Sequence, residues 1–442
     1  VSSQKCIRTI DIDIIGETDR HLSFFEMLGN FSVGEYFKED AIKYSYEYIT
    51  EVLKVDKDKL WFTVYKDDDE AYNIWKNVIG VPENRIQRGN EDNFWHMNIP
   101  GPCGPCSEIF IDRGSKYGKD GGPIGGGEDR FIEIWNLVFM ESIQDQPFQV
   151  IDELPKKNID TGMGLERIAM IMQDKDNLFD TDLFKPLRDA LLSQITVNDN
   201  KYEKIIIDHI KSSTFMISDG VVPTNEGRGY VLRRLIRRAI RAYNQLNSSN
   251  TSLTFLIEIV IDMYASSYPE LQDNKDKILK LFIKEEEIFQ KTLNKGLQEI
   301  NNLISSNKSI TPKDAFYLFE TFGFPYELTK EISAENKIDI NDEDFKIRNA
   351  VEVWQESINS HVGNIREFAT SNPNLYRGQA TVTQFSKTGD RIRTYKFEGF
   401  YPQAVAPIDL SWDADAIEEF SVTWAYDYWT VSGPTATGNV PS

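Results

Sequence analysis

The stretch Asp160–Arg167, which reads Asp-Thr-Gly-Met-Gly-Leu-Glu-Arg, constrains the fold more than any other part of the chain. It follows an apolar strand pattern and leads into a helical one, so it predicts a strand-to-helix junction. Asp160 would lie at the strand edge and accept hydrogen bonds from an ammonium group. Gly162 and Gly164 would let a nucleotide approach the backbone, and Arg167 would offer its planar guanidinium to phosphate oxygens. The alternative is an N-capped helix with a solvated arginine.

Length and charge limit the classes of protein that fit this chain. Its 442 residues suffice for about two to four domains. The net charge of -21 argues against a generally basic nucleic-acid surface, so any RNA contact requires a local basic patch. No run approaches the ~20 apolar residues that span a bilayer, so no membrane partner is expected. The N-terminus has neither an initiator Met nor a signal-peptide pattern, which predicts a truncated start.

The three cysteines are Cys6, Cys103 and Cys106. They are too few and too unevenly placed for a disulfide framework, which indicates a reducing, cytoplasmic location. Cys103 and Cys106 form a lone Cys-x-x-Cys motif. A zinc site needs about four ligands, and no second Cys/His pair lies at a suitable spacing. Tight-turn packing of residues 101–106 is therefore preferred over a protein-bound metal.

Three segments of the chain differ in their patterns. Residues 1–195 mix short apolar strands with helices and predict an α+β domain. Residues 196–339 follow a helical period and predict an all-helical domain. Residues 340–442 alternate polar with apolar and aromatic residues, which predicts a small antiparallel β domain with a flexible tail. Strands are expected at Ser23–Leu28, Leu60–Val64, Ile109–Ile111, Ile132–Phe139, Gln379–Phe385, Arg391–Phe400 and Glu419–Tyr428, and helices at Ala41–Leu53 and Glu70–Val78.

Two arginines, Arg8 and Arg20, flank a polar and acidic segment near the N-terminus. Two strands joined by this segment would place both on one face of a hairpin. An arginine on a rigid strand can hold an α-phosphate while a carboxylate attacks and pyrophosphate leaves. The alternative is a pair of surface arginines that balance acidic neighbours. Asn136, inside the run Ile-Trp-Asn-Leu-Val, must be satisfied once buried, by core backbone or by the carboxylate of a small ligand.

Five motifs in order resemble the catalytic domain of the alanyl-tRNA synthetases, which are class II aminoacyl-tRNA synthetases. The motifs are Arg20-His, Phe24-Phe-Glu-Met-Leu-Gly-Asn-Phe-Ser, Gly101-Pro-Cys-Gly-Pro-Cys-Ser-Glu, Glu133-Ile-Trp-Asn-Leu-Val-Phe-Met and the junction at residues 160–168. The resemblance covers residues 1 to about 339 and implies an antiparallel class II sheet with flanking helices. By this resemblance, we expect the sequence to lack the family's first strand and helix and also the family's editing and C-terminal domains.

The resemblance implies roles for individual residues. Arg8 would contact the α-phosphate of ATP and Arg167 the γ-phosphate, while Asp160 would take the ammonium of L-alanine. The rest of the nucleotide site would comprise Arg20, Met27, Trp95, Gly162 and Gly164. Trp95 and Val138 would wall a pocket sized for a methyl group, and Asn136 would contact the alanine carboxylate region. The implied reaction is Mg²⁺-dependent attack of that carboxylate on the α-phosphorus without a general base, followed by transfer to the alanine tRNA.

Residues 225–241 combine an apolar helical stripe with a cluster of arginines, Arg233, Arg234, Arg237, Arg238 and Arg241. In so acidic a chain the cluster predicts a track for a nucleic-acid phosphate backbone, and the family resemblance implies tRNA in contact with Arg233, Arg237 and Arg241. The alternative is a solvated face with salt bridges. The segment resembles the family's tRNA-recognition domain, in which the position of Asn225 reads the acceptor stem. Its companion is an aspartate in the family but Glu320 here, which puts the precision of tRNA discrimination in doubt. A tRNA-binding module without catalysis is a further hypothesis.

From about residue 341 the sequence instead resembles the C-terminal half of the tail tube protein of contractile-tailed phages. The resemblance rests on Asn341–Trp354 and on the aromatic motifs Tyr395–Pro402, Leu410–Asp413 and Tyr426–Trp429. It implies self-association through a sheet that joins neighbours into a hexameric ring, and a location in the virion tail. A generic antiparallel β domain is the alternative. The chain would then be a natural, engineered or erroneous fusion of an enzyme with a structural segment.

Overall fold

The computed structural model describes residues 1–97, 99–225, 227–247, 252–305, 310, 312–322, 324, 326–336, 338, 378–385, 391–405, 422–425 and 428–432. The chain divides into two compact units, Val1–Thr292 and Leu293–Ser442. This division falls inside one long helix. The domain boundaries that the sequence pattern predicts, near residues 195 and 339, stay predictions.

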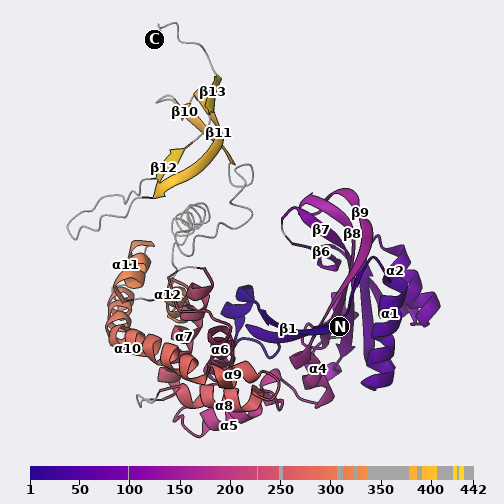
Figure 1. The fold of residues 1–442 in the computed structure, drawn as a ribbon, viewed down its shortest axis with the longest axis horizontal. Coiled ribbons are helices and arrows are strands. Elements are labelled where there is room, and N and C mark those ends of the chain that lie inside the picture. The colour runs from indigo at the N-terminus through magenta and orange to yellow at the C-terminus, as the bar shows by residue number, and fades with distance from the viewer. Residues whose placement is uncertain are drawn as a thin grey trace. The chain divides into compact units, whose positions relative to one another are not determined.

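A nine-stranded sheet forms the first part of the N-terminal unit (Figure 1). Its strands lie in the order β1-β2-β9-β8-β7-β4-β5, with β3 paired to β9 and β6 paired to β7. Only β4 and β5 run parallel; the other pairs described are antiparallel. The strands are β1 (Ser2–Ile7), β2 (Phe24–Gly29), β3 (Phe31–Val33), β4 (Leu60–Tyr65), β5 (Ile86–Gly89), β6 (Phe94–His96), β7 (Gly101–Asp112), β8 (Phe131–Gln146) and β9 (Gln149–Gly164). The predicted antiparallel sheet with flanking helices is confirmed.

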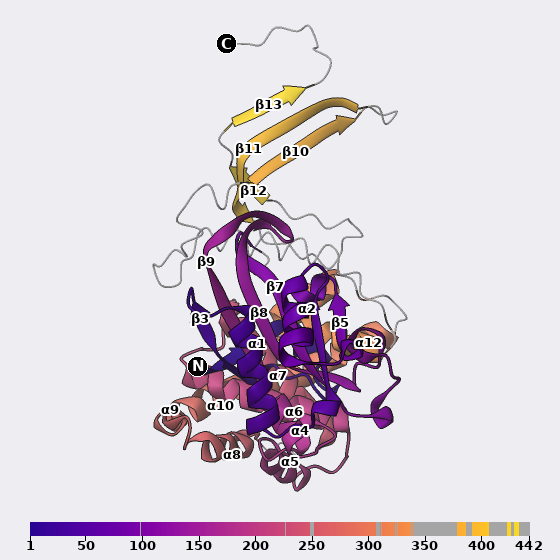
Figure 2. The ribbon, with the colours of Figure 1, turned by 90° about the vertical axis from the view of Figure 1, so that its right-hand side faces the viewer.

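Helices α1 (Lys38–Glu47) and α2 (Asp69–Asn73) cover one face of this sheet, as both ribbon views show (Figures 1 and 2). The indole of Trp75, just after α2, packs on Phe62 of β4 with ring centroids 4.1 Å apart. Its Nε1 donates to Ser107 Oγ at 2.9 Å, so the buried ring leaves no polar atom unsatisfied. Burying each of these rings contributes about 2–3 kcal/mol, which fixes α2 on the sheet.

Residues 101–106 do not form the expected tight turn. They begin strand β7, whose pairing with β8 shifts register between Cys103 and Cys106. Gly104 is required there because a Cβ at this position would lie 2.0 Å from the carbonyl oxygen of Phe139. Both cysteines are buried, free thiols. The prediction of a turn is wrong because the prolines are accommodated at a bulge and do not end the strand.

A group of helices completes the N-terminal unit. It comprises α4 (Leu165–Met172), α5 (Lys185–Leu192), α6 (Asn200–Ser218), α7 (Gly227–Leu246), α8 (Thr254–Tyr264), α9 (Pro269–Asp273) and the first part of α10 (Lys275–Ser305), while the short α3 (Gly122–Gly125) lies in the loop before β8. Every residue of α6 from Glu203 to Ser218 is buried. The charged residues of α6 therefore need partners inside the protein. Each helix within the described residues is too short or too polar to span a membrane.

The C-terminal unit contains the rest of α10, then α11 (Pro312–Phe322), α12 (Tyr326–Glu335) and a four-stranded sheet. Strand β11 (Arg391–Val405) pairs antiparallel with β10 (Gly378–Phe385), β12 (Val422–Ala425) and β13 (Tyr428–Ser432). This confirms the predicted antiparallel β region. The segments 341–354 and 410–413, on which the tail-tube resemblance partly rests, lie outside the described residues.

Candidate nucleotide and amino-acid site

Strands β1 and β2 form the hairpin that the sequence predicts, with Ile7 opposite Phe24 at its open end. Residues 8–23 connect the strands and are called the hairpin loop below. Arg8 begins this loop, and its backbone N–H donates to the carbonyl oxygen of Ser23 at 2.9 Å. Arg20 lies near the other end of the hairpin loop. The two arginines therefore occupy opposite ends of one short segment rather than distant surfaces.

The junction after β9 turns directly into α4. Gly164 is the N-cap of α4 and provides no side-chain cap, so the junction is not a conventional capped helix start. Gly164 is paired with Met27 of β2. A Cβ on Gly162 would lie 2.6 Å from the Met27 sulfur, which explains the glycine there. This close approach brings Arg167, at the start of α4, beside the hairpin.

The hairpin loop, β8 and the start of α4 enclose a narrow cavity of about 70 Å³. Five residues proposed from the sequence for the nucleotide line it: Arg8, Arg20, Met27, Gly164 and Arg167. The cavity is also lined by Asp11, His21 and Glu133. Arg8 and Arg167, far apart in the chain, thus face one space.

Carboxylates hold the three cavity arginines. Arg167 Nη1 donates to the backbone carbonyl of Glu133 at 3.1 Å and to its Oε2 at 3.2 Å. Arg8 Nε lies 3.5 Å from Asp11 Oδ2. Arg20 is paired with Glu128 and Asp129, whose side chains are 85% and 68% exposed. Such exposed pairs are worth about 0–1 kcal/mol, so an anionic ligand could displace them from Arg20 at little cost.

His21 adds a polar but uncharged wall to the cavity. Burial, and then the positive charge of Arg20, lower the pKa of its imidazole. Its Nδ1 lies 2.8 Å from the hydroxyl oxygen of Thr18. The ring is therefore neutral near pH 7, and the positive charge in the cavity comes from the arginines.

A second group of residues lines up across the strands beside this cavity. The register places Glu108, Asn136 and Gly162 opposite one another, and places Val138 opposite Asp160 two residues along. Positions two residues apart share one face of a sheet. Asn136 Oδ1 is buried and has no hydrogen-bond partner among the described residues. A buried acceptor of this kind needs a hydrogen-bond donor, which a small ligand can supply.

Two carboxyl groups of this face have unusual proton affinities. Burial raises the pKa of Asp160. Burial and the negative charge of Glu133 raise the pKa of Glu108 to about 8, although Thr63 Oγ1 and Asn93 Nδ2 each donate to it at 3.1 Å. Sequence reasoning gave no role to Glu108 or Glu133. For Glu108 the available signal was the pairing of β7 with β8, which places it opposite Asn136. Glu133 lies three residues before Asn136, so alternation alone did not place it beside that side chain.

The remaining sequence-predicted residues are less closely grouped. Trp95 lies half-buried on β6, opposite Gly104 of β7, and does not line the arginine cavity. Val138 is buried. Their role as walls of an alanine pocket stays a prediction. Among the described residues no cluster of three or more Asp, Glu, His or Cys side chains could hold a metal ion by itself.

The basic helix α7 faces inward more than expected. Arg237 and Arg241 are 5% and 3% exposed, and Arg237 Nε donates to Glu285 Oε1 at 2.7 Å. The burial of these two side chains removes them from the exposed phosphate track that the sequence predicts. For Arg237, α10 supplies a buried carboxylate against the helix. Arg233 contacts the same Glu285 at 3.1 Å and also donates to Asn225. The side chain of Glu320 lies outside the described residues.

Comparison with known proteins decides the family. Residues 1–392 match the family of class II (A) tRNA synthetases. The chain belongs to this family. The match of this class II synthetase chain runs past residue 339, where the resemblance was expected to end.

Curated relatives of this class II synthetase chain share one name. It is 43% identical over 418 residues to the alanine–tRNA ligase of Corynebacterium diphtheriae, which covers 87% of this chain and 47% of the relative. It is 48% identical over 357 residues to that of Caldicellulosiruptor saccharolyticus, covering 77% and 40%. The chain thus spans about half the length of the curated relatives it matches. Neither the family nor these relatives support the tail-tube resemblance, which stays a prediction.

Proposed function

We propose that this chain activates L-alanine with ATP, forming alanyl-adenylate and pyrophosphate, and passes the alanyl group to the alanine tRNA. The observation that carries the proposal is the convergence of Arg8 and Arg167 on one cavity. Two guanidinium groups that line one cavity suit a chain of phosphates better than a single anion. The similarity to alanine–tRNA ligases gives the amino acid and the RNA.

The first step joins a carboxylate to a phosphorus atom. An oxygen of the alanine carboxylate attacks the α-phosphorus, the bond to the β-phosphate oxygen breaks, and pyrophosphate leaves with the electron pair of that bond. No proton moves, so no general base is needed. Arg8 would stabilise the charge on the α-phosphate, and Arg167 would hold the γ-phosphate in line. Mg²⁺ would neutralise phosphate charge, with Glu133 and Asp11 among the cavity carboxylates that could bind it.

The face beside the cavity would hold the amino acid. Asp160 would accept hydrogen bonds from the alanine ammonium. Asn136, whose buried Oδ1 has no hydrogen-bond partner among the described residues, would contact the alanine carboxylate region. Val138 and Trp95 would bound a pocket for the methyl group. Such a pocket excludes larger side chains by sterics but discriminates weakly against glycine and serine, because one methylene or hydroxyl changes binding by only about 1–3 kcal/mol.

In the second step a tRNA hydroxyl oxygen would attack the alanyl carbonyl carbon and form an ester, while the bond from that carbon to the phosphate oxygen breaks. AMP would leave with the electron pair of that bond, and the hydroxyl proton would pass to the AMP phosphate or to water. Asn225, at the start of α7, and Arg233 beside it are the residues we propose for tRNA contact, with Glu320 as the companion of Asn225. We propose that both steps take place in the cytosol. We do not propose a hexameric ring or a tail-tube role for residues 340–442, because no observation favours them over an ordinary β region.

Alanine-dependent exchange of labelled pyrophosphate into ATP tests the proposal directly. We expect the full chain to catalyse exchange with alanine and much more slowly without it. Asp160→Asn should raise the KM for alanine about 10- to 100-fold, since a hydrogen bond to a charged group is worth about 1.5–3 kcal/mol. Arg88→Ala, which removes an exposed ion pair with Asp69, is the control and should change neither the KM for alanine nor the KM for ATP. A folded wild-type chain without alanine-dependent exchange contradicts the proposal.

A further inference from the structure

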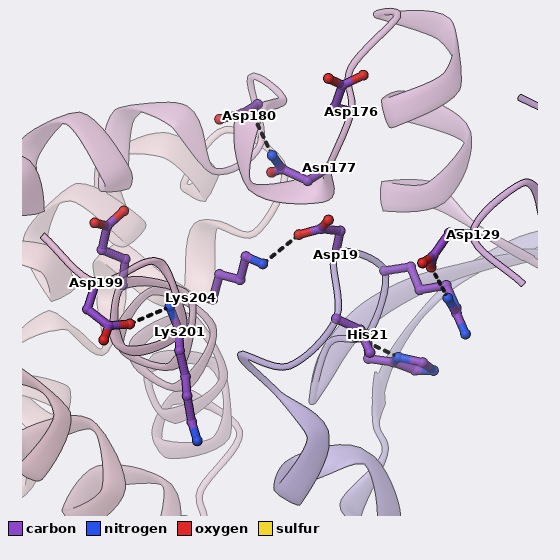
Figure 3. A network of polar contacts seen from close by, with 12 residues as sticks. Asp19, His21, Asp129, Asp176, Asn177, Asp180, Asp199, Lys201 and Lys204 are labelled. Atoms are coloured by element: carbon purple, nitrogen blue, oxygen red, sulfur yellow. Dashed lines mark hydrogen bonds and ion pairs between the residues drawn. The ribbon is translucent and has the colours of Figure 1, made fainter. Parts of the chain in front are cut away.

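Three ion pairs join the hairpin loop to helices α6 and α7. Asp13 is paired with Arg234 of α7, and Glu17 lies 2.7 Å from Lys201 of α6. Lys204, one turn further along α6, reaches Asp19 (Figure 3). The three carboxylates are more than half exposed, so each pair contributes about 0–1 kcal/mol. These outer contacts alone do not fix the hairpin loop.

A buried arginine of α7 also contacts the hairpin loop. Arg238 of α7 is 5% exposed. Its Nη1 donates to the carbonyl oxygen of Ile12 at 2.8 Å, and its Nη2 donates to that of Ile15 at 3.3 Å. Both isoleucines are fully buried. One planar guanidinium therefore grips the backbone of the hairpin loop at two points, which a lysine ammonium cannot reproduce in the same geometry.

The neighbouring histidine is held in one tautomer by this arginine. His209 Nε2 lies 3.0 Å from Arg238 Nη1. A guanidinium only donates, so Nε2 must accept and the ring proton must sit on Nδ1. Nδ1 lies 2.8 Å from Asp208 Oδ2 and donates to it. The imidazole is thus neutral and connects a buried cation to a buried carboxylate.

Asp208 extends the connection to the other end of the hairpin loop. Its Oδ1 accepts the backbone N–H of Ser23 at 2.8 Å, and its Oδ2 accepts the Ser23 hydroxyl. Asp208 and His209 are at most 1% exposed. Buried charges are tolerated when they are paired and fully hydrogen-bonded, which this arrangement achieves. Asp208, His209 and Arg238, here called the clamp, therefore grip the hairpin loop at its middle and at its end.

We propose that Arg238, oriented by His209 and Asp208, is a positioning residue for ATP activation: it fixes the hairpin loop and thereby places Arg8 and Arg20 at the cavity. Arg8 lies four residues before Ile12, and Arg20 lies five residues after Ile15, so the gripped carbonyls stand between the two phosphate-binding side chains. The proposal rests on the function proposed above. It gives the inner arginine of α7 a task in the chemistry of ATP rather than in contact with RNA.

The kinetic test separates positioning from loss of folded protein. Arg238→Gln and Arg238→Lys should raise the KM for ATP at least about 10-fold in pyrophosphate exchange, which corresponds to about 1.4 kcal/mol. The KM for alanine should stay within about twofold, because Asn136 and Asp160 lie on β8 and β9, outside the hairpin loop. A lower folded fraction would reduce the rate without changing either KM. Lys201→Gln, which removes an outer contact to the same loop, is the matched control and should leave both constants unchanged.

A second measurement does not depend on activity. Hydrogen exchange of the amides in residues 9–19 should be faster in the Arg238 variants than in the wild-type chain and in Lys201→Gln, while exchange in β7 and β8 is unchanged. Arg238→Lys keeps a cation beside His209 and carries the test should Arg238→Gln not fold. Unchanged exchange in residues 9–19 overturns the proposal even for a chain that lacks pyrophosphate exchange. The proposal is also overturned if the Arg238 variants raise the KM for ATP and the KM for alanine equally, or if their KM for ATP stays within twofold of the wild-type value.

Discussion

Two groups of arginines in this chain have the same chemistry and opposite surroundings. Around the cavity, Arg20 is paired with the exposed Glu128 and Asp129, while Arg8 is itself 53% exposed and lies 3.5 Å from Asp11. On α7, Arg237 is paired with Glu285, and both side chains are at most 6% exposed. An arginine with exposed partners can exchange them for a ligand at little cost, whereas one with a buried partner cannot leave it without exposing an unpaired charge.

This difference separates arginines that can bind a ligand from arginines that stabilise the fold. Sequence reasoning assigned both groups to phosphate contacts, ATP for the first and tRNA for the second. The burial of Arg237 and Arg241 assigns the inner face of α7 to the protein interior instead. The tRNA contact that we propose is therefore confined to the exposed start of α7, near Asn225.

The largest expected effect is on stability. Arg237→Met should lower the free energy of unfolding by about 3–5 kcal/mol, because it leaves Glu285 buried with less compensation. The double variant Arg237→Met/Glu285→Leu should recover most of this loss. Arg234→Met, whose partner Asp13 is 65% exposed, should cost less than about 1 kcal/mol. Denaturant unfolding measures all three, and equal costs for Arg237→Met and Arg234→Met would break the comparison.

Loss of a cavity arginine should affect the reaction and spare stability. Arg167→Ala should lower the rate of pyrophosphate exchange about 10²- to 10³-fold, since it removes a preorganised donor to the triphosphate. Its unfolding midpoint should remain close to that of the wild type, because its partner Glu133 is 35% exposed. Exchange assays and denaturant unfolding on the same preparations check this. A destabilised but fully active variant would reverse the assignment of the two groups.

Glu108 sharpens the comparison, because the hydrogen-bond partners of its carboxyl group among the described residues, Thr63 and Asn93, are both uncharged. The pKa of Glu108 is raised to about 8, whereas the group ionises near its usual 4.5 in the unfolded chain. Between these values the native state binds more protons, so the free energy of unfolding should fall as pH rises, by at most about 1.4 kcal/mol per pH unit. Glu108→Gln keeps a neutral side chain and should lack this slope. Unfolding curves at about pH 5 and about pH 8 that shift in parallel for both proteins would contradict the expectation.

The smallest effect concerns the exposed partners of Arg20. Glu128→Gln with Asp129→Asn should free Arg20 for the nucleotide and lower the KM for ATP about two- to fivefold, in line with the small energy of exposed pairs. Glu39→Gln, which removes an exposed pair with Lys43 on α1, is the control. A rise in the KM for ATP in the double variant would show that the two carboxylates help to bind ATP.

The sequence predicted most strands of the sheet and the pairing of the Arg8 hairpin, since alternation and apolar runs are local signals. It also brought Arg8 and Arg167 together, through the resemblance of their motifs. It missed the burial of Arg237, because Glu285 lies 48 residues away and pairing across helices leaves no local pattern. It missed the raised pKa of Glu108 for the same reason: burial by other strands is not visible in the residues beside it. The bulge at Cys103 depended on close packing against Phe139, which glycine and proline spacing alone did not reveal.

The central claim is that Arg8 and Arg167 hold opposite ends of one triphosphate, and titration of the chain with ATP and with AMP tests it most directly. Arg167→Ala should weaken ATP binding about 10- to 100-fold and leave AMP binding unchanged, because AMP has no γ-phosphate. Arg8→Ala should weaken the binding of both nucleotides. Equal effects of Arg167→Ala on ATP and AMP, or no effect of either variant on ATP, would contradict the claim.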